Sequence, residues 1–177
     1  MNLRVAQWAT GNIGMRALRE VIRHPGLDLA GVLVYDPAKN GVDAGALCGE
    51  KPVGVAATTD PAAIVALHAD CVLYMPRALV LDEVVALLES GTNVVTTRGE
   101  LFAGGHRLDS GDRARIVEAC ARGNASIYAT GSSPGFITDA LPLALLSMQR
   151  HVESIEIEEF ANLSCRDSPH LLFELMG

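Results

Sequence analysis

The sequence lacks any run of basic residues. Its 14 lysines and arginines are outnumbered by 21 aspartates and glutamates, which gives a formal net charge of −7. A protein that binds nucleic acid through its phosphates needs a concentrated positive surface. The composition therefore argues against nucleic acid as a partner, and any phosphate contact is expected to be local.

Long hydrophobic runs are also missing. Residues 140–146 form one of the longest apolar stretches, and this is far shorter than the roughly 20 apolar residues of a membrane-spanning helix. Met1 leads almost at once into a predicted strand, without the pattern of a secretory signal. We therefore expect no membrane partner and a cytoplasmic location.

The four cysteines lack the spacing of a zinc site or a disulfide framework. Cys48, Cys71, Cys120 and Cys165 are widely separated, with no C-x-x-C motif and no paired histidines. We therefore expect no metal ion. Cys71 and Cys120 are predicted to fill core positions, and Cys48 and Cys165 to lie in loops.

The sequence does contain a regular alternation of apolar, β-branched runs and helical patterns, which is typical of βαβ units. Strands are predicted at 4–9, 29–35, 71–75, 93–97 and 126–129, and helices at 13–23, 61–68, 82–90, 112–122 and 138–147. Asp60 and Pro61 are predicted to begin the second helix, and Gly123 to end the fourth. The prediction is an α/β fold with a doubly wound, Rossmann-like parallel sheet, whose strands are buried on both faces and whose ligand lies beyond their carboxyl ends.

The first strand runs directly into a glycine turn that opens a helix. Ala9 replaces the first glycine of the fingerprint G-x-G-x-x-G, while Gly11 and Gly14 occupy its other two positions. Free N–H groups and the positive end of the helix dipole at such a turn suit a pyrophosphate, which Gly11 lets approach closely. Gly14 and Ala17 are small enough for the helix to pack tightly on the sheet. The alternative is a tight strand-to-helix turn without a ligand.

From His151 onward the pattern changes. Residues 152–160 alternate apolar and acidic side chains, which predicts a strand with one solvated face. We therefore divide the chain into a dinucleotide-binding domain at 1–150 and the beginning of a second, α+β domain at 151–177. Because the second domain has hardly begun when the sequence stops, we expect the chain to be a fragment, a truncated gene product or half of a split protein.

Two polar residues follow the second predicted strand. Asp36 lies where a carboxylate commonly accepts hydrogen bonds from the adenosine ribose, which favours NAD. Lys39 has the charge to neutralise a 2′-phosphate, which favours NADP. The sequence leaves both cofactors open, and it also leaves open that Asp36 and Pro37 simply start an ordinary turn.

The loops after the third and fifth strands are predicted to contact the cofactor. The segment with Pro76 is expected to pass beneath the cofactor, where Pro76 bends the chain away from the sheet. Arg77 either reaches a phosphate or a substrate carboxylate or is solvated. Ser133 is in a loop that is expected to touch the nicotinamide amide or the substrate. Its alternative is a turn without contacts, in which Thr138 and Asp139 cap the next helix.

The loop after the fourth strand contains the best catalytic candidate, Glu100. A carboxylate at this place can hold an ammonium or iminium nitrogen by a charge-assisted hydrogen bond and relay a proton as hydride moves to the adjacent carbon. The alternative is an ordinary surface glutamate.

Six motifs in order carry a resemblance over essentially the whole chain: ATGNIG, VYDPAKNGVDAGALCG, ADCVLYMPR, NVVTTRGELF, TGSSPGFITDALPL and SCRDSPHLLFELMG. Together they resemble the dihydrodipicolinate-reductase-like oxidoreductases, which include 2,4-diaminopentanoate dehydrogenase and the native amine dehydrogenases. Those proteins join an N-terminal dinucleotide-binding domain to a C-terminal domain that completes the substrate pocket and the homodimer. The resemblance assigns roles as follows: the pyrophosphate to Gly11, Asn12, Ile13 and Gly14, the adenosine ribose region to Asp36 and Lys39, and the substrate amine to Glu100.

The sequence departs from the pattern of this family at two places. Many relatives have serine where Asp36 stands, a difference that favours NAD. Many also have Asn-Pro-Gly where this chain has Ser133-Pro134-Gly135, which changes the hydrogen-bonding group on the substrate side. The paired-histidine and lysine motif of the reductases of lysine synthesis is not present in the sequence.

The resemblance implies an NAD(P)-dependent oxidoreductase that interconverts an imine and an amine on a small amine or amino-acid-like substrate. Two alternatives remain, a non-catalytic dinucleotide-binding fragment or subunit and a 4-hydroxy-tetrahydrodipicolinate reductase. The sequence does not choose among substrates, between NAD and NADP, or among oligomeric states.

Overall fold

The chain folds around a five-stranded parallel sheet with the strand order β2-β1-β3-β4-β5. The computed structural model describes residues 2–160, 162 and 173. The strands are β1 (Leu3–Trp8), β2 (Leu27–Leu33), β3 (Cys71–Tyr74), β4 (Asn93–Thr96) and β5 (Ile127–Ala129). All five predicted strands are present, so the predicted Rossmann-like sheet is confirmed.

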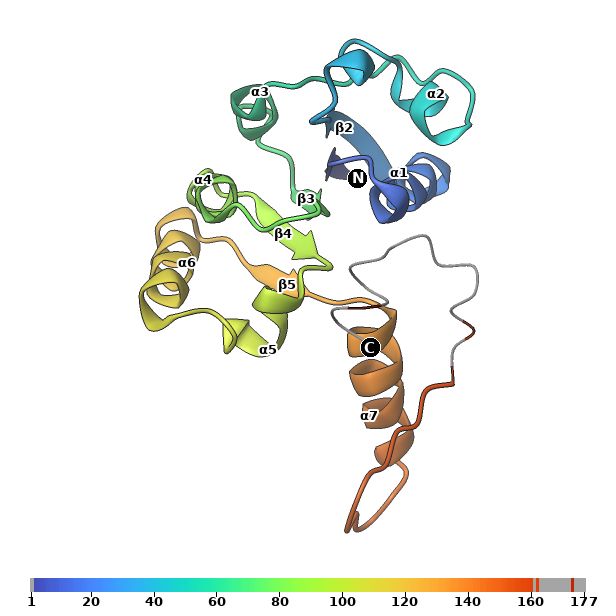
Figure 1. Ribbon diagram of the computed structural model, residues 1–177, viewed down its shortest axis with the longest axis vertical. Coiled ribbons are helices and arrows are strands. Elements are labelled where there is room, and N and C mark those ends of the chain that lie inside the picture. The colour runs from blue at the N-terminus through green and yellow to red at the C-terminus, as the bar shows by residue number, and fades with distance from the viewer. Residues whose placement is uncertain (1, 161, 163–172, 174–177) are drawn as a thin grey trace.

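Helices lie on both faces of this sheet, as Figure 1 shows: α1 and α2 on one side, and α3, α4 and α6 on the other. The helices are α1 (Asn12–Arg23), α2 (Ala44–Cys48), α3 (Pro61–Val65), α4 (Leu81–Glu89), α5 (Phe102–Gly105), α6 (Ser110–Gly123) and α7 (Leu141–Leu146), with the shorter or irregular η1 (Pro37–Lys39), η2 (Gly99–Leu101) and η3 (Ser132–Ala140). Alternation along β2 explains the two layers. Leu33 packs in the cluster that includes α3, α4 and α6, while Val32 and Val34 pack with α1 and α2.

The predicted start of α3 is confirmed. The Asp60 side chain accepts a hydrogen bond from the Ala62 N–H at 2.9 Å, and Pro61 occupies the first helical position. The predicted end of α6 is wrong by one residue, because Asn124, with φ of 49°, adopts the left-handed conformation after the helix. Gly123 is required for another reason: a Cβ there would lie 1.8 Å from the Leu88 carbonyl oxygen of α4.

Gly123→Ala should therefore lower the free energy of unfolding by about 2 kcal/mol, because the added methyl forces α6 away from α4. Urea denaturation followed by circular dichroism measures this change. Gly99→Ala is the matched control, since the nearest atom to a Cβ at Gly99 is Arg107 Nη1 at 3.9 Å. Equal stability of the two variants would show that the α4–α6 contact relaxes without cost.

Two burial predictions are wrong. Cys48 is buried at the end of α2 rather than in a loop, because α2 forms within the connection that the sequence pattern left without structure. Tyr128 of the edge strand β5 is 60% exposed, so this strand is not buried on both faces. The core predictions for Cys71 and Cys120 are closer, since both are partly buried and Cys120 packs against the main apolar cluster.

The helix predicted at 138–147 begins earlier, within η3, and continues into α7. Thr138 lies inside its first turn, where its hydroxyl accepts a hydrogen bond from the Gly135 N–H at 2.8 Å. Such a bond from the first turn back to the preceding chain is one half of a capping box. Thr138 therefore stabilises the start of the helix, as expected, although from within the helix.

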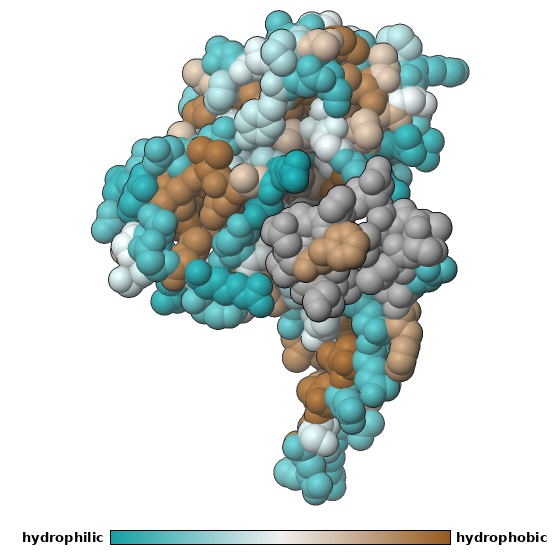
Figure 2. Space-filling view, viewed as in Figure 1, coloured by the Kyte–Doolittle hydropathy of each residue, from teal (hydrophilic) through white to brown (hydrophobic). Residues whose placement is uncertain are grey.

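The strand predicted at residues 152–160 is not formed, and these residues are exposed without regular structure. A strand needs a neighbour to pair its backbone groups, and none of the described residues supplies one here. Figure 2 shows apolar side chains along the projecting helix, and Leu143, Leu145 and Met148 are exposed there. The second domain stays a prediction. Cys165 and the motif from Ser164 to Gly177 lie outside the described residues, apart from Phe173.

Candidate functional site

The carboxyl ends of the five strands form one row. In the sheet register Trp8 pairs with Leu33 and Tyr74, Tyr74 pairs with Thr96, and Thr96 pairs with Ala129. The loop that follows each of these residues therefore emerges at the same edge of the sheet. All the predicted site residues lie in these five loops or at the first turn of α1.

The glycine turn between β1 and α1 has the backbone of a dinucleotide fingerprint. Ala9, with φ of 74°, holds the left-handed conformation that the first glycine usually supplies, at a cost of about 1 kcal/mol. A Cβ on Gly14 would lie 2.1 Å from the Ala9 carbonyl oxygen, whereas a Cβ on Gly11 would meet nothing within 4 Å. Gly14 therefore allows the turn to close, and the space above Gly11 is open.

Gln7, a residue of β1 that we did not predict as part of the site, fixes this turn with its side chain. Its buried side-chain amide donates to the carbonyl oxygens of Ala9 at 2.9 Å and Trp8 at 3.3 Å. Gln7 Oε1 is the buried side-chain atom without a hydrogen-bond partner among the residues that the structure describes. A buried polar residue inside an otherwise apolar strand was the signal that could have identified Gln7.

Gly11 is the N-cap of α1, and no side chain caps the helix there. Asn12 and Ile13 follow it and are exposed. The first N–H groups of a helix have no partner within the helix. The turn thus presents uncapped backbone donors beside an open space, which is a suitable arrangement for a phosphate.

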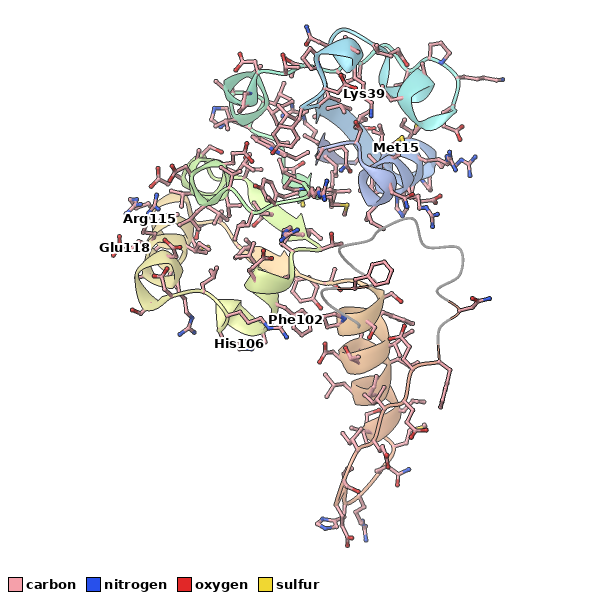
Figure 3. The ribbon with its side chains drawn as sticks, in the orientation of Figure 1. Met15, Lys39, Phe102, His106, Arg115 and Glu118 are labelled. Carbon is pink, nitrogen blue, oxygen red and sulfur yellow. The ribbon has the colours of Figure 1, made fainter. Side chains whose placement is uncertain are left out.

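Asp36 and Lys39 lie at the two ends of η1. The Asp36 carboxylate accepts from the Ala38 N–H at 2.9 Å, so it does start a turn. Lys39 Nζ reaches the glycine turn, where it donates to the Thr10 carbonyl oxygen at 3.3 Å and to Thr10 Oγ1 at 3.4 Å. In Figure 3 Lys39 lies on the segment after β2, near α1, which carries Met15. The structure therefore joins the loops after β1 and β2.

A hydrogen-bonded network fixes the segment that carries Asp36. Trp8 Nε1 donates to the Tyr35 hydroxyl at 2.9 Å, and that hydroxyl donates to Glu83 Oε2 at 2.9 Å. Tyr74 donates to the same carboxylate oxygen at 2.8 Å. Burial, assisted by the Glu83 carboxylate, raises the pKa of Tyr35 to about 12, so Tyr35 stays protonated and keeps donating. Sequence reasoning missed this network because its members lie far apart in the chain.

Glu100 lies in η2, after β4, with its side chain 38% exposed. Both nitrogens at one edge of the Arg98 guanidinium donate to the two Glu100 carboxylate oxygens, with Nε at 3.1 Å from Oε2. Burial raises the pKa of Glu100, but the bond from Arg98 and the charges of Arg98 and Arg107 outweigh it and hold that pKa below its usual value. Glu100 is therefore ionised and oriented at neutral pH.

Arg98 also connects this loop to the one after β3, because its Nη1 donates to the Arg77 carbonyl oxygen at 2.5 Å. Arg77 is exposed and Pro76 is buried beside it. Ser133 is exposed after β5, and no hydrogen bond joins it to the other predicted residues within the described part of the chain. The geometry thus links the loops after β1 and β2 through Lys39, and the loops after β3 and β4 through Arg98.

A groove of about 540 Å³ runs along the β5 edge and meets the row of strand ends at Ala129. Leu101, Phe102, Ile116 and Tyr128 are among the apolar residues that line it. None of the predicted site residues lines the groove. The candidate site is therefore the open carboxyl edge of the sheet.

Within residues 2–160, 162 and 173, no three or more His, Cys, Asp or Glu side chains gather in a way that would hold a metal ion. In the same part of the chain, no helix has both the length and the apolarity needed to cross a membrane.

Comparison with known proteins finds a relative whose similarity extends over nearly the whole chain. No protein-family model matches it. A curated amine dehydrogenase from Streptomyces virginiae is 33% identical over 177 residues, an alignment that covers 96% of this chain and 49% of that protein. The chain is a homologue of the amine dehydrogenases. It spans about half the length of the curated relative that it matches.

Solved structures agree on the fold of this amine dehydrogenase homologue. An amine dehydrogenase from Mycobacterium smegmatis superposes with a TM-score of 0.70 at 21% identity, over 85% of this chain and 45% of that one. An engineered D-amino acid dehydrogenase bound to NADP+ gives 0.57 at 20% identity, over 83% and 42% of the two chains. The resemblance to amine dehydrogenases found in the six sequence motifs is thus confirmed, and the solved structures support the Rossmann-like fold.

Proposed function

We propose that the chain binds a nicotinamide dinucleotide, NAD or NADP, along the carboxyl edge of its sheet, as the cofactor domain of an amine-acting oxidoreductase. The observation that carries this proposal is the turn at Gly11, where uncapped helix N–H groups face open space. The homology to amine dehydrogenases supports a small amine or amino-acid-like substrate. The predicted homodimer and cytoplasmic location stay predictions.

The residues present fit such a cofactor. A pyrophosphate needs backbone donors and a nearby positive charge, and the turn supplies both through α1 and Lys39. The Asp36 carboxylate uses one oxygen for the Ala38 N–H, and its other oxygen has no bond among the described residues and is available to a ribose hydroxyl. We assign Pro76, Arg77 and Ser133 to the same edge, nearer to the nicotinamide.

When bound, the nicotinamide ring donates or accepts the hydride. Glu100 holds the substrate nitrogen as an ammonium or iminium by a charge-assisted hydrogen bond. Arg98 keeps that carboxylate ionised and directed, since it occupies both oxygens from one side. Glu100 retains lone pairs for the substrate on its exposed side.

Titration of the purified chain with NADH and NADPH tests the proposal. Saturable enhancement of nicotinamide fluorescence, together with a rise in the thermal midpoint, is the expected result for at least one of them. A folded chain that binds neither dinucleotide would overturn the proposed function.

Glu100→Gln should lower amine turnover about tenfold, because the neutral amide loses one charge-assisted hydrogen bond to the substrate nitrogen, and should leave NADH affinity unchanged. Turnover is followed as NADH formed from a panel of amines. Since the chain spans half of its relative, the assay is run with and without the second half of the Streptomyces virginiae protein.

The matched control is Glu118→Gln, which removes the same charge from the exposed face of α6. Turnover that is equal in both variants would remove Glu100 from the reaction. Dihydrodipicolinate is assayed in the opposite direction, as NADH or NADPH consumed, because its reduction is the remaining enzymatic alternative.

Because the chain spans about half the length of its curated relative, a second candidate function is a dinucleotide-binding module that is not catalytic by itself. It predicts cofactor binding without turnover by the chain alone. Turnover restored by the added second half would identify a subunit of a split enzyme.

A further inference from the structure

Ala9 is the residue at which the chain leaves the sheet for α1. Its N–H still belongs to the sheet, where it donates to the Leu33 carbonyl oxygen at 3.0 Å. Its own carbonyl oxygen is directed toward α1, since a Cβ on Gly14 would lie only 2.1 Å from it. The backbone of Ala9 has a φ of 74° at this change of direction. Glycine adopts such a left-handed conformation freely, whereas alanine adopts it under strain.

The carbonyl oxygen of Ala9 depends on Gln7 for its hydrogen bond. Ala9 is 5% exposed, and a buried carbonyl oxygen needs a donor from the protein. Gln7 Nε2 donates to this oxygen at 2.9 Å, and no backbone N–H of the described residues does so. The same nitrogen also donates to the Trp8 carbonyl oxygen at 3.3 Å. Because both partners are carbonyl oxygens, the atom between them is the amide nitrogen of Gln7.

Stability alone does not explain a glutamine at this position. The Gln7 side chain is fully buried, and its Oε1 is without a partner in the part of the chain that the structure describes. A buried amide oxygen without a hydrogen bond destabilises a fold. Methionine has a similar length and would fill the same space without an unsatisfied oxygen. What Gln7 supplies, and methionine lacks, is the donor to Ala9.

The conformation of Ala9 sets the course of the residues proposed to hold the pyrophosphate. Thr10 and Gly11 follow it directly, and α1 begins at Asn12. A relaxation of Ala9 to negative φ would turn the peptide units of Thr10 and Gly11, next to the open space at Gly11. In the fingerprint the first glycine allows this tight turn. Here a hydrogen bond from a side chain holds an alanine in it.

We propose that Gln7 is a positioning residue for the dinucleotide. Its bond to Ala9 replaces the conformational freedom of the missing first glycine and keeps the turn in the shape that binds the pyrophosphate. This proposal rests on the proposed dinucleotide binding, and it gives a role in that binding to a residue that does not touch the ligand. It also makes Gln7 and Ala9 interdependent, so the effect of losing Gln7 depends on the residue at position 9.

A double-mutant cycle on NADH affinity tests this interdependence. Gln7→Met is made in the parent chain and in a chain that already carries Ala9→Gly. In the parent chain it should weaken NADH binding about tenfold, the effect of one hydrogen bond lost at a buried acceptor. In the Ala9→Gly chain the loss should stay below about threefold, because glycine keeps the left-handed conformation without help. Isothermal titration calorimetry measures the four affinities, and NADPH, which has the same pyrophosphate, should respond by the same factors.

Urea denaturation of the same four chains separates positioning from stability. If Gln7 were merely structural, its loss would change the free energy of unfolding and leave the NADH affinity of the folded chain unaltered. Gln149→Met is the matched control, because it makes the same substitution at an exposed position and should change neither quantity. Gln7→Leu carries the same expectations as Gln7→Met, so the test does not depend on the folding of one variant.

The outcomes separate this proposal from the proposed function. A folded parent chain that binds neither dinucleotide would end both. If the parent chain binds NADH and Gln7→Met binds it equally well, the positioning role is overturned while dinucleotide binding stands. An equal loss of affinity in the parent and Ala9→Gly chains also overturns it, because Gln7 would then act by a route other than Ala9.

Discussion

Gly11→Ala should lower the affinity of the chain for NADH and NADPH about a hundredfold, the loss of one to two charge-assisted hydrogen bonds. The open space above Gly11 is where we place the pyrophosphate, and the added methyl group would occupy it. The backbone there has φ of −70° and ψ of −171°, which alanine adopts without strain. Isothermal titration calorimetry measures the affinity.

The same variant should fold as the parent does. Alanine is a poorer N-cap than glycine, but it also restricts the unfolded chain, and these effects offset each other to within about 1 kcal/mol. Urea denaturation checks this expectation. Unchanged affinity in a folded Gly11→Ala chain would show that no phosphate approaches this residue, and the proposed site would be wrong.

Gly14→Ala should lose the fold of the turn as well as the ligand. Its methyl would lie 2.1 Å from the Ala9 carbonyl oxygen and 3.0 Å from Gln7 Nε2. Both atoms belong to the hydrogen bond between Gln7 and Ala9 that fixes the turn, and Gly14 is buried. We expect the free energy of unfolding to fall by about 3 kcal/mol, together with loss of measurable dinucleotide binding.

Chemical denaturation and the NADH titration measure these two effects. Glu20→Ala, at an exposed position of α1, should leave both unchanged. A Gly14→Ala chain with the stability of the parent would mean that the helix shifts to admit the methyl, and Gly14 would then not be needed for close packing. The two variants thus test two different roles within one motif: Gly11 lets the ligand approach, and Gly14 lets the turn close.

Much of the fold could be predicted because it depends on local patterns. Strand positions follow from β-branched apolar runs, and the start of α3 follows from Asp60 and Pro61. The end of α6 was harder, because Asn124 and Gly123 are both able to end a helix. The alternation at 152–160 predicts a strand only if a neighbouring strand is present to pair with it.

The candidate site was predictable in outline and not in its contacts. Parallel strands bring the residues that follow them to one edge, so Gly11, Asp36, Arg77 and Glu100 were placed together from sequence order alone. The hydrogen bonds from Lys39 to Thr10 and from Arg98 to Glu100 depend on the directions of the side chains, which the spacing of residues in the sequence does not predict.

The sequence by itself determined the alternation of strands and helices, the glycine turn and the relationship to amine dehydrogenases, because each is encoded in residues close together or in motif order. The tertiary structure alone decided which distant groups meet: Tyr35 with Glu83, and Lys39 beside α1 rather than beside Asp36. Such contacts join segments far apart in the chain, and their geometry exists only after the sheet has brought its loops to one edge.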